Sequence, residues 1–330
     1  MSPAALAILL VSVFLAASAL IEAVRRMAIA WHLYDVPNTR SSHSQPTPRA
    51  GGVGIVAGVL GGMTVAASVG MMPAAPSSWT FIGAGLAVAL VSLVDDFRPL
   101  PPHVRFLVHS AAAVAVTTAC GPIREIDLGG AALSLGPAAY PLTWIWIVGV
   151  TNAFNFMDGI DGIAGAQALV AAAGWILLSP DRSIVVVSAL TATAAAAFLL
   201  RNVPPASIFM GDVGSAFLGF AFASIPLLAS ENRSLVIPAV LLLWPFLFDT
   251  TFTLFRRLRR GENILLAHRS HLYQRLNIAG WSHGAVTSFY ALLALVGVAA
   301  AVAFNRVTAA VLLPAAAGLA LWQVVRSAER

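Results

Sequence analysis

Four polar side chains that could bind a cation or a polar ligand lie close together in one stretch of the chain. They are Asn152, Asn155, Asp158 and Asp161. The stretch 152–162 separates the apolar runs 141–150 and 163–178, and an ionised carboxylate at a membrane edge is costly unless a cation or hydrogen bonds compensate for it. Because Gly159 and Gly162 favour a break between two helices, the stretch is either a ligand site or a short solvated loop.

A second acidic feature is the adjacent pair Asp95 and Asp96, which follows the apolar run 79–94. Adjacent carboxylates repel each other, so both stay ionised only near a cation or an arginine. Acidic residues at a helix C-terminus also oppose the helix dipole, which disfavours an ordinary solvated helix end. A divalent metal or a role as base would explain the pair.

The segment 209–215 places Asp212 between glycines in front of another apolar run. Gly211, Gly214 and Ser215 predict a tight turn at a helix N-terminus, where free backbone N–H groups can bind phosphate. Asp212 could hold a hard divalent cation there, since oxygen ligands completed by phosphates suit Mg²⁺ or Mn²⁺. A capping role for Asp212 is an alternative that can coexist with metal binding.

Thr47 and Arg49 lie in the Pro/Gly-rich segment 46–52. A hydroxyl, a cation and glycine backbone together could bind an anion. By itself this pattern is weak, because helices commonly begin with proline and glycine.

A histidine-containing segment lies near the C-terminal third of the chain. His268 and His271 are three residues apart and flank Arg269, so a helix would place both imidazoles on one face. No third soft ligand lies nearby, which disfavours zinc. Recognition of phosphate or sugar is therefore the preferred interpretation, whereas the preceding basic run 256–260 is best explained as charge at the lipid headgroups.

The composition is that of a polytopic membrane protein. Of 330 residues, 59% are hydrophobic and 10% are charged, and the mean hydropathy is +0.85, far more apolar than a soluble domain. All 19 basic residues are arginine and are spread over short loops, so we expect no nucleic-acid partner. The single Cys120 excludes an intrachain disulfide.

Apolar runs predict an all-α bundle of about eleven membrane-spanning helices in one domain, residues 1–330. Ten would follow if a short or polar run does not cross. The N-terminal run has no basic residues before it and is long, so we interpret it as a retained span. The ranges are 3–24, 51–72, 79–94, 104–121, 140–156, 163–179, 184–200, 212–229, 235–255, 284–304 and 307–325.

The distribution of arginine predicts the orientation of these spans. Fifteen arginines fall near the loops on one side and four near those on the other, so the positive-inside rule makes the first side cytoplasmic. The N-terminus is then outside and the C-terminus inside. Every unusual polar cluster falls on the predicted cytoplasmic side, so we expect the clusters to converge on one site.

These motifs, in this order, resemble the polyprenyl-phosphate N-acetylhexosamine-1-phosphate transferases. The resemblance runs from about residue 35 to residue 283. It rests on Asp95-Asp96, on Asn152-x-x-Asn155-x-x-Asp158-Gly-x-Asp161-Gly, on Phe209-Met-Gly-Asp212-x-Gly-Ser215 and on the loop His268-Arg-Ser-His271. That loop is most similar to the O-antigen-initiating branch and lacks the three-histidine run of the peptidoglycan translocase.

The resemblance implies a reaction in the bacterial inner membrane. UDP-HexNAc and undecaprenyl phosphate would give undecaprenyl-diphospho-HexNAc and UMP, the first step of O-antigen or other cell-surface polysaccharide synthesis. GlcNAc or a deoxy analogue would be the sugar, and Mg²⁺, or alternatively Mn²⁺, the cofactor. Family members also occur as homodimers.

The resemblance also implies roles for individual residues. Asp212 would bind Mg²⁺, with Asn155 as a second ligand, while Asp95 and Asp96 would face the phosphates and one could act as base. Asp161, Asn202 and Phe209 match positions near the nucleoside. His268, Arg269 and His271 match the loop that holds the diphosphate and sugar, and Asp158 joins the catalytic group with the least defined role. Pro99 stands where one branch has a lysine, so Arg98 or Arg105 would have to supply a cation.

A secondary transporter of an anionic sugar or nucleotide is the competing interpretation. Transporters carry polar sites near the bilayer midplane and contain internal repeats. Here the polar clusters map to span ends on one side, and no repeat is evident, which favours an enzyme.

Overall fold

The computed structural model describes residues 2–37, 42–43, 45–128, 131–229, 235–263, 266, 268–303 and 306–329. The helices are α1 (Pro3–Ala30), α2 (Gly52–Ser68), α3 (Pro76–Phe97), α4 (Pro102–Cys120), α5 (Ala139–Phe156), α6 (Ile163–Leu178), α7 (Arg182–Asn202), α8 (Asp212–Ser224), α9 (Val236–Arg259), α10 (Leu272–Ile278), α11 (His283–Ala303) and α12 (Arg306–Ala328). The 3-10 helices are η1 (Gly136–Ala138) and η2 (Ile225–Leu228). The strands are β1 (Tyr34–Asp35), β2 (Thr47–Pro48), β3 (Glu125–Asp127) and β4 (Ala132–Ser134).

The protein is an all-α membrane bundle, as its apolar runs predict. Every predicted span corresponds to one helix among the described residues, with η2 extending α8. Six helices of this part of the chain are long and apolar enough to cross a membrane, and three shorter apolar helices accompany them. The seven-residue α10 was not predicted, because it is too short and too polar to give an apolar run.

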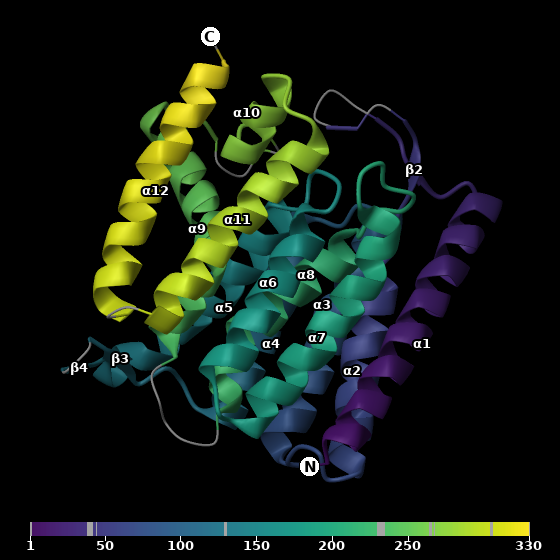
Figure 1. Ribbon diagram of the computed structural model, residues 1–330, viewed down its shortest axis with the longest axis vertical. Helices are drawn as coiled ribbons and strands as arrows, with labels where there is room; N and C mark the ends of the chain where they lie inside the picture. Colours follow the sequence, from purple (N-terminus) through teal and green to yellow (C-terminus); the bar gives the residue numbers. More distant parts are fainter. Residues whose placement is uncertain are drawn as a thin grey trace.

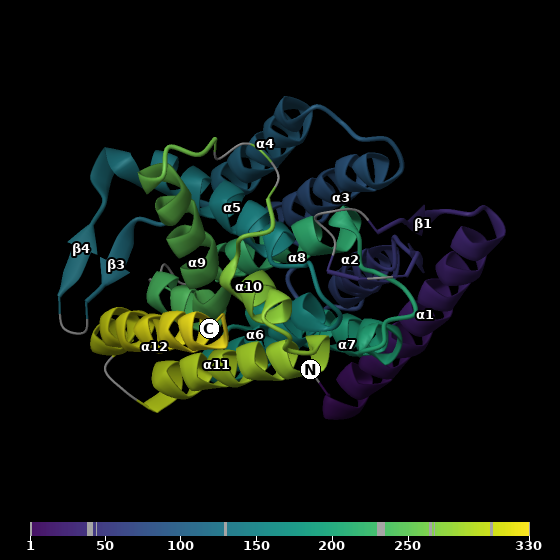
Figure 2. The same ribbon diagram turned by 90° about the horizontal axis from the view of Figure 1, so that it is seen from above.

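Helix α8 forms the centre of the bundle. All of its residues from Val213 to Ser224 are buried, and α2, α3 and α5 pack around it. Its sequence is apolar or small at nearly every position, as expected for a helix surrounded on all sides by other helices. Viewed from above, α1 and α12 lie at opposite edges of the molecule (Figure 2).

The two ends of the bundle differ. Helix α10 and strand β2 lie at the end where α12 finishes, and the antiparallel hairpin of β3 and β4 lies at the other end, where α1 begins (Figure 1). We call these the α10 end and the hairpin end. Helices α3, α5, α7 and α9 finish, and α2, α6, α8 and α11 begin, at the α10 end. The loops that carry the predicted site residues therefore share this end of the molecule.

Glycines in the left-handed region begin two of the central helices. Gly162 precedes α6 with a φ of 81°, and Gly211 precedes α8 with a φ of 72°. Residues with a Cβ rarely adopt this conformation, so glycine allows a sharp turn from loop to helix. As a result, Asp161 and Asp212, which stand next to these turns, both lie near helix starts and line the same cavity.

Candidate functional site

A polar cavity of ≈ 560 Å³ opens at the α10 end. Its walls come from the segment before α2, the ends of α3 and α7, the loops that precede α6 and α8, and the starts of α10 and α11. Seven of the thirteen site residues predicted from the sequence line it, namely Arg49, Asp96, Asp158, Asp161, Asn202, Phe209 and Asp212. The other six, Thr47, Asn155, Asp95, His268, Arg269 and His271, lie behind or beside these walls.

The carboxylate of Asp96 binds the N-terminus of α8. Its Oδ1 accepts the Asp212 N–H at 2.9 Å, and its Oδ2 accepts the Val213 N–H at 3.1 Å. The first N–H groups of a helix have no partner within the helix and carry partial positive charge, so they stabilise a buried carboxylate. A Cβ on Gly211 would lie only 2.6 Å from Asp96 Oδ2, which explains the glycine.

This contact corrects one prediction. The turn before α8 does not offer these two N–H groups to phosphate, because Asp96 already occupies them. The N-cap residue is Gly211 and not Asp212, which is the first residue of the helix. The sequence pattern correctly indicates an anion at this helix start, but the anion is a side chain of the protein itself.

Arg105 joins Asp95 to Asp212. Its Nη1 lies 2.6 Å from Asp95 Oδ2 and 2.8 Å from Asp212 Oδ2. Asp95 Oδ1 also accepts the Leu100 N–H, so this carboxylate lies behind Asp212 and does not itself line the cavity. Of the two arginines that could replace the missing lysine, Arg105 is the one held among the carboxylates, whereas Arg98 is exposed.

Asn155 supports Asp212 from behind. Its Nδ2 donates to Ser215 Oγ at 2.9 Å, and its side chain also hydrogen-bonds to the Asp212 carboxylate. In this orientation Asn155 donates through nitrogen. To act as a metal ligand, Asn155 would have to rotate its amide so that the oxygen, and not the nitrogen, points to the side of Asp212.

Asp158 is the least compensated carboxylate of the cavity. Its side chain accepts no hydrogen bond from any residue within the described ranges. Burial, and then the charges of Asp212, Asp96 and Asp161, raise the pKa of Asp158 to about 8. A carboxyl group that resists ionisation in a wet cavity marks a place where a cation would be bound favourably.

Asp161 is held by His283, a residue that spacing in the sequence did not single out. The Nδ1 of His283 lies 3.3 Å from Asp161 Oδ1, and its Nε2 lies 3.0 Å from the Ser42 carbonyl oxygen. The Ala206 N–H donates to Asp161 Oδ2 at 3.0 Å. Burial alone would raise the pKa of Asp161, but the His283 and Ala206 hydrogen bonds outweigh it and the pKa is lowered. The pKa of Asp161 is therefore lowered, whereas the pKa of Asp158, three residues earlier, is raised.

Asn202 and Phe209 form the wall beside Asp161. Asn202 Oδ1 accepts the Gly162 N–H at 2.8 Å, and its Nδ2 donates to the Ile208 carbonyl at 2.9 Å. The ring of Phe209 meets His43 edge-on, with centroids 4.8 Å apart. An aromatic face and fixed polar atoms are suited to a planar, hydrogen-bonding ligand.

The segment before α2 closes the cavity from the other side. The Phe209 N–H donates to the Pro48 carbonyl, and the Gly51 and Gly52 N–H groups donate to the carbonyls of Phe209 and Met210. Arg49 lines the cavity and its charge acts on Asp96. Thr47 is buried in β2, with its hydroxyl bonded to the Gln45 carbonyl, and does not reach the cavity.

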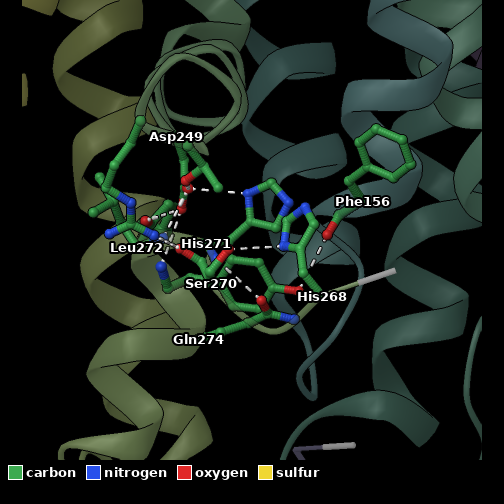
Figure 3. Close-up of polar contacts among 11 residues, drawn as sticks. Phe156, Asp249, His268, Ser270, His271, Leu272 and Gln274 are labelled. Atoms are coloured by element: carbon green, nitrogen blue, oxygen red, sulfur yellow. Dashed lines mark hydrogen bonds and ion pairs between the residues drawn. The ribbon is translucent and has the colours of Figure 1, made fainter. Parts of the chain in front are cut away.

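The histidine segment lies beside the cavity and is organised around a buried acid, Asp249 (Figure 3). His271 Nδ1 lies 3.2 Å from Asp249 Oδ1. The His268 ring lies tilted against the His271 ring, with centroids 4.9 Å apart, and hydrogen-bonds to Ser270. Burial, and then the nearby His271 and Arg257, lower the pKa of His268 to about 4. Arg269 donates to Asn277.

One of the residues that sequence reasoning missed could have been found by a simple signal. Asp249 is an isolated acidic residue inside the predicted span 235–255, and an ionisable residue within a span is a functional-site hypothesis by default. Gln274 also lines the cavity, but nothing in its spacing distinguishes it. His43 and His283 gave no such signal, since only the fold brings them to Phe209 and Asp161.

The charges around the cavity fit a hard divalent cation. Within the described residues, five carboxylates line the cavity but only one guanidinium, that of Arg49. A diphosphate could not enter so acidic a site unless a cation neutralised it. The oxygen atoms of Asp158 and Asp212 are the donors such a cation prefers. In the described part of the chain no three acidic or histidine side chains form a closed metal site, so a ligand would have to complete the coordination shell.

Comparison with known proteins gives consistent matches. A family model described as "Glycosyl transferase family 4" matches residues 78–230, which include Asp95 and Asp212. A Bacillus subtilis protein named probable undecaprenyl-phosphate N-acetylglucosaminyl 1-phosphate transferase is 33% identical over 79% of this chain and 74% of its own length.

Two further relatives cover 88% of this chain. The Mycobacterium tuberculosis decaprenyl-phosphate N-acetylglucosaminephosphotransferase is 30% identical over 81% of its length. The Escherichia coli undecaprenyl-phosphate alpha-N-acetylglucosaminyl 1-phosphate transferase is 27% identical over 83% of its length. With the acidic cavity at one end of a membrane bundle, these matches show that the chain belongs to the polyprenyl-phosphate N-acetylhexosamine-1-phosphate transferase family.

Proposed function

We propose that this protein transfers HexNAc-1-phosphate from a UDP-HexNAc to undecaprenyl phosphate, releasing UMP. One observation carries the proposal: in a chain of this family, Asp96, Asp158, Asp161 and Asp212 converge on one cavity at the end of membrane helices. A soluble nucleotide sugar could reach such a cavity from water, while a lipid phosphate reaches it from the bilayer. The names of the relatives support the same pair of substrate classes.

The reaction is a single displacement at phosphorus. An oxygen of the lipid phosphate attacks the β-phosphorus of the UDP-sugar and forms the new P–O bond. The bond from the β-phosphorus to the bridging oxygen breaks, and UMP leaves with that oxygen and its electron pair. A phosphate monoester is largely dianionic at neutral pH because its second pKa is about 6, so the attack needs little help from a base.

The residues around the cavity divide into three roles in this proposal. Asp161, Asn202 and Phe209 bind the nucleoside, supported by the aromatic and hydrogen-bonding wall they form. Arg49 contributes positive charge toward the phosphates. Asp158, which has no hydrogen-bond partner among the described residues, is the carboxylate left free to meet the reacting groups.

Mg²⁺, with Mn²⁺ as an alternative, is the proposed cofactor. Asp212 would hold it, with Asp158 close by, and Asn155 would join only after turning its amide. When bound, the ion would neutralise the diphosphate and orient the displacement. The surplus of carboxylates over arginine in the cavity supports this part of the proposal.

A covalent phospho-enzyme at an aspartate is the competing mechanism. Asp96 is a poor nucleophile for it, because both of its oxygens accept backbone N–H groups. Asp158 is therefore the residue to examine. Incubation with donor alone, followed by mass spectrometry of the protein, should find no phosphorylated aspartate if the displacement is direct.

The protein is proposed to act in the bacterial inner membrane, with the α10 end and the C-terminus in the cytoplasm and the N-terminus outside. The asymmetry in arginine supports this orientation. The product would start O-antigen or another cell-surface polysaccharide. GlcNAc is the first donor to assay, followed by deoxy HexNAc donors such as FucNAc and QuiNAc. Family membership and the position of the acidic cluster at helix ends favour this enzyme over a transporter.

The decisive measurement is release of UMP from UDP-GlcNAc and undecaprenyl phosphate by the purified protein in detergent, with Mg²⁺ or with EDTA. We expect Mg²⁺-dependent release, and we expect Asp212→Asn to abolish it. Asn152→Ala is a matched control, because among the described residues the Asn152 amide bonds to its own helix alone, at the Val148 carbonyl. Near-normal release by Asp212→Asn would remove Asp212 from the metal site, and no release with any UDP-HexNAc would remove the proposed function.

A further inference from the structure

We propose that Asp249 is a positioning residue that holds α10 against the loop 157–162 and so keeps Asp158 and Asp161 in place for the reaction. The inference deepens the proposed function and rests on it. Asp249 does not line the cavity and is completely buried within α9. It therefore acts on the substrates only through the elements it holds.

Asp249 is the anchor for the start of α10 (Figure 3). Its Oδ1 accepts the Leu272 N–H at 2.8 Å, and its Oδ2 accepts the Tyr273 N–H at 3.0 Å. The Tyr290 hydroxyl of α11 donates to Oδ2 at 2.7 Å. One carboxylate thus joins α9, α10 and α11. The seven-residue α10 is too short to be stable by itself in water, so its position depends on such anchors.

Helix α10 in turn contacts the backbone of the loop that carries the two aspartates. The Tyr273 hydroxyl donates to the Phe156 carbonyl at 3.1 Å. It also lies so close to Gly159 that a Cβ there would be 2.1 Å from the hydroxyl oxygen. Gly159 follows Asp158 directly. Direct contacts therefore connect Asp249 to the cavity: the carboxylate binds Tyr273, and Tyr273 contacts Phe156 and Gly159 next to Asp158.

The chemistry of the surroundings explains why this residue is an acid. The groups that contact Asp249 all donate to it: two backbone N–H groups, the hydroxyls of Thr253 and Tyr290, and the imidazole of His271. A carboxylate only accepts, whereas an asparagine would direct an N–H₂ group at one of these donors. Asp249→Asn therefore keeps the size of the side chain but disrupts the anchor.

The first experiment compares Asp249→Asn with Thr250→Val in the purified full-length protein. Thr250 is the next residue of α9, and its buried hydroxyl has no hydrogen-bond partner among the described residues, so Thr250→Val removes none of the hydrogen bonds that the structure shows. We expect Asp249→Asn to lower kcat about tenfold to a hundredfold, because small displacements of a reacting group have effects of that size. We also expect a higher KM for the UDP-sugar, because Asp161 moves with the loop. A smaller folded fraction would lower kcat without changing KM.

A second variant keeps the test valid if Asp249→Asn does not fold. Tyr273→Phe removes the bond to Phe156 and leaves the Asp249 anchor intact. It should lower kcat while the protein stays folded at the assay temperature, although loss of this one bond lowers the thermal unfolding temperature slightly. If Asp249 acts through Tyr273, the double variant should lose less activity than the product of the two single losses.

The outcomes separate the two proposals. If the wild-type protein releases no UMP, the proposed function fails. If it does, and Asp249→Asn behaves like Thr250→Val, the positioning role is wrong. The positioning role is also wrong if the double variant loses as much activity as the product of the losses in Asp249→Asn and Tyr273→Phe. The same conclusion follows if Asp249→Asn unfolds while Tyr273→Phe retains full activity. A kinetic loss in Tyr273→Phe with an intact fold supports it even where Asp249→Asn unfolds.

Discussion

At the scale of single residues, the carboxylates of this site differ in the groups that stabilise their negative charge. Asp96 accepts two backbone N–H groups, Asp95 pairs with Arg105, and Asp161 pairs with His283. Asp158 has no such partner among the described residues, and its pKa is raised to about 8. Aspartate therefore supplies, within one site, both carboxylates that are fixed by the fold and one carboxylate that has no hydrogen-bond partner among the described residues.

The raised pKa of Asp158 predicts a pH-dependent stability. Its folded-state pKa of about 8 lies above the ordinary unfolded value of about 4. Its contribution to stability is therefore complete below about pH 4 and is lost as the pH rises through about 8. In EDTA, the thermal unfolding temperature should fall more between pH 5 and pH 9 for the wild type than for Asp158→Asn. Equal pH profiles for the two proteins would contradict the assignment.

Arg105 should influence both the metal and the chemistry. Arg105→Gln removes the guanidinium that bonds to Asp212, so the site becomes more negative and the Mg²⁺ concentration for half-maximal activity should fall. The kcat should fall about tenfold, as expected for loss of one charge-assisted hydrogen bond. Titration of UMP release with Mg²⁺ measures both effects. Arg98→Gln, on the exposed surface next to α3, is the control and should change neither value.

At the scale of elements, the site is built by joining helix ends that lie far apart in the sequence. The C-terminal end of α3 is a poor place for a carboxylate, but the N-terminus of α8 opposes that effect with its own N–H groups. In the same way, Asn202 at the end of α7 bonds to the loop before α6 and to the loop before α8. The end of α3 thus fixes the start of α8, and the end of α7 fixes the loops that precede α6 and α8.

Asn202→Ala should therefore weaken the fold as well as the site. It leaves the Gly162 N–H and the Ile208 carbonyl without their partner, at a cost of about 1–3 kcal/mol for each buried group. The free energy of unfolding should fall accordingly, and the KM for the UDP-sugar should rise because both loops border the cavity. Thermal unfolding and steady-state kinetics test this, with Asn152→Ala as the control whose amide bonds within its own helix.

At the scale of the whole molecule, the loops and helix ends that line the polar cavity lie at the α10 end of an apolar bundle, and the exposed β3–β4 hairpin lies at the opposite end (Figure 1). With the proposed orientation, this arrangement would keep the proposed water-soluble donor on the cytoplasmic side of the membrane. It also makes the orientation measurable, since exposed positions exist at both ends. Leu133 is 50% exposed on the hairpin, and Arg260 is exposed beyond α9.

An impermeant maleimide should label the hairpin end from outside the cell. In a Cys120→Ala background, Leu133→Cys should react on intact spheroplasts, and Arg260→Cys should react only after the membrane is opened. The reverse pattern would place the cavity outside and contradict the proposed cytoplasmic orientation. Retained UMP release by both variants in detergent would show that the substitutions leave the fold intact.

The sequence by itself determined the class of this protein and the course of its chain. A helix rises 1.5 Å per residue, so a run of about 20 apolar residues spans a bilayer wherever it occurs. That local rule located the eleven predicted helices, and the polar residues between them located the loops. Asp96, Asp158, Asp161 and Asp212 could be predicted as site residues because each stands out against apolar neighbours.

Only the tertiary structure decided which groups hold these aspartates. Asp96 meets the start of α8 116 positions later, and Arg105 meets Asp212 107 positions later. His283 reaches Asp161 across 122 positions. Such contacts follow from how the helices pack around α8 and not from local spacing. For the same reason, the hydrogen bonds of Asp249 to α10 and the contact of Tyr273 with Gly159 could not be predicted from the sequence, because they depend on where α10 packs in the fold.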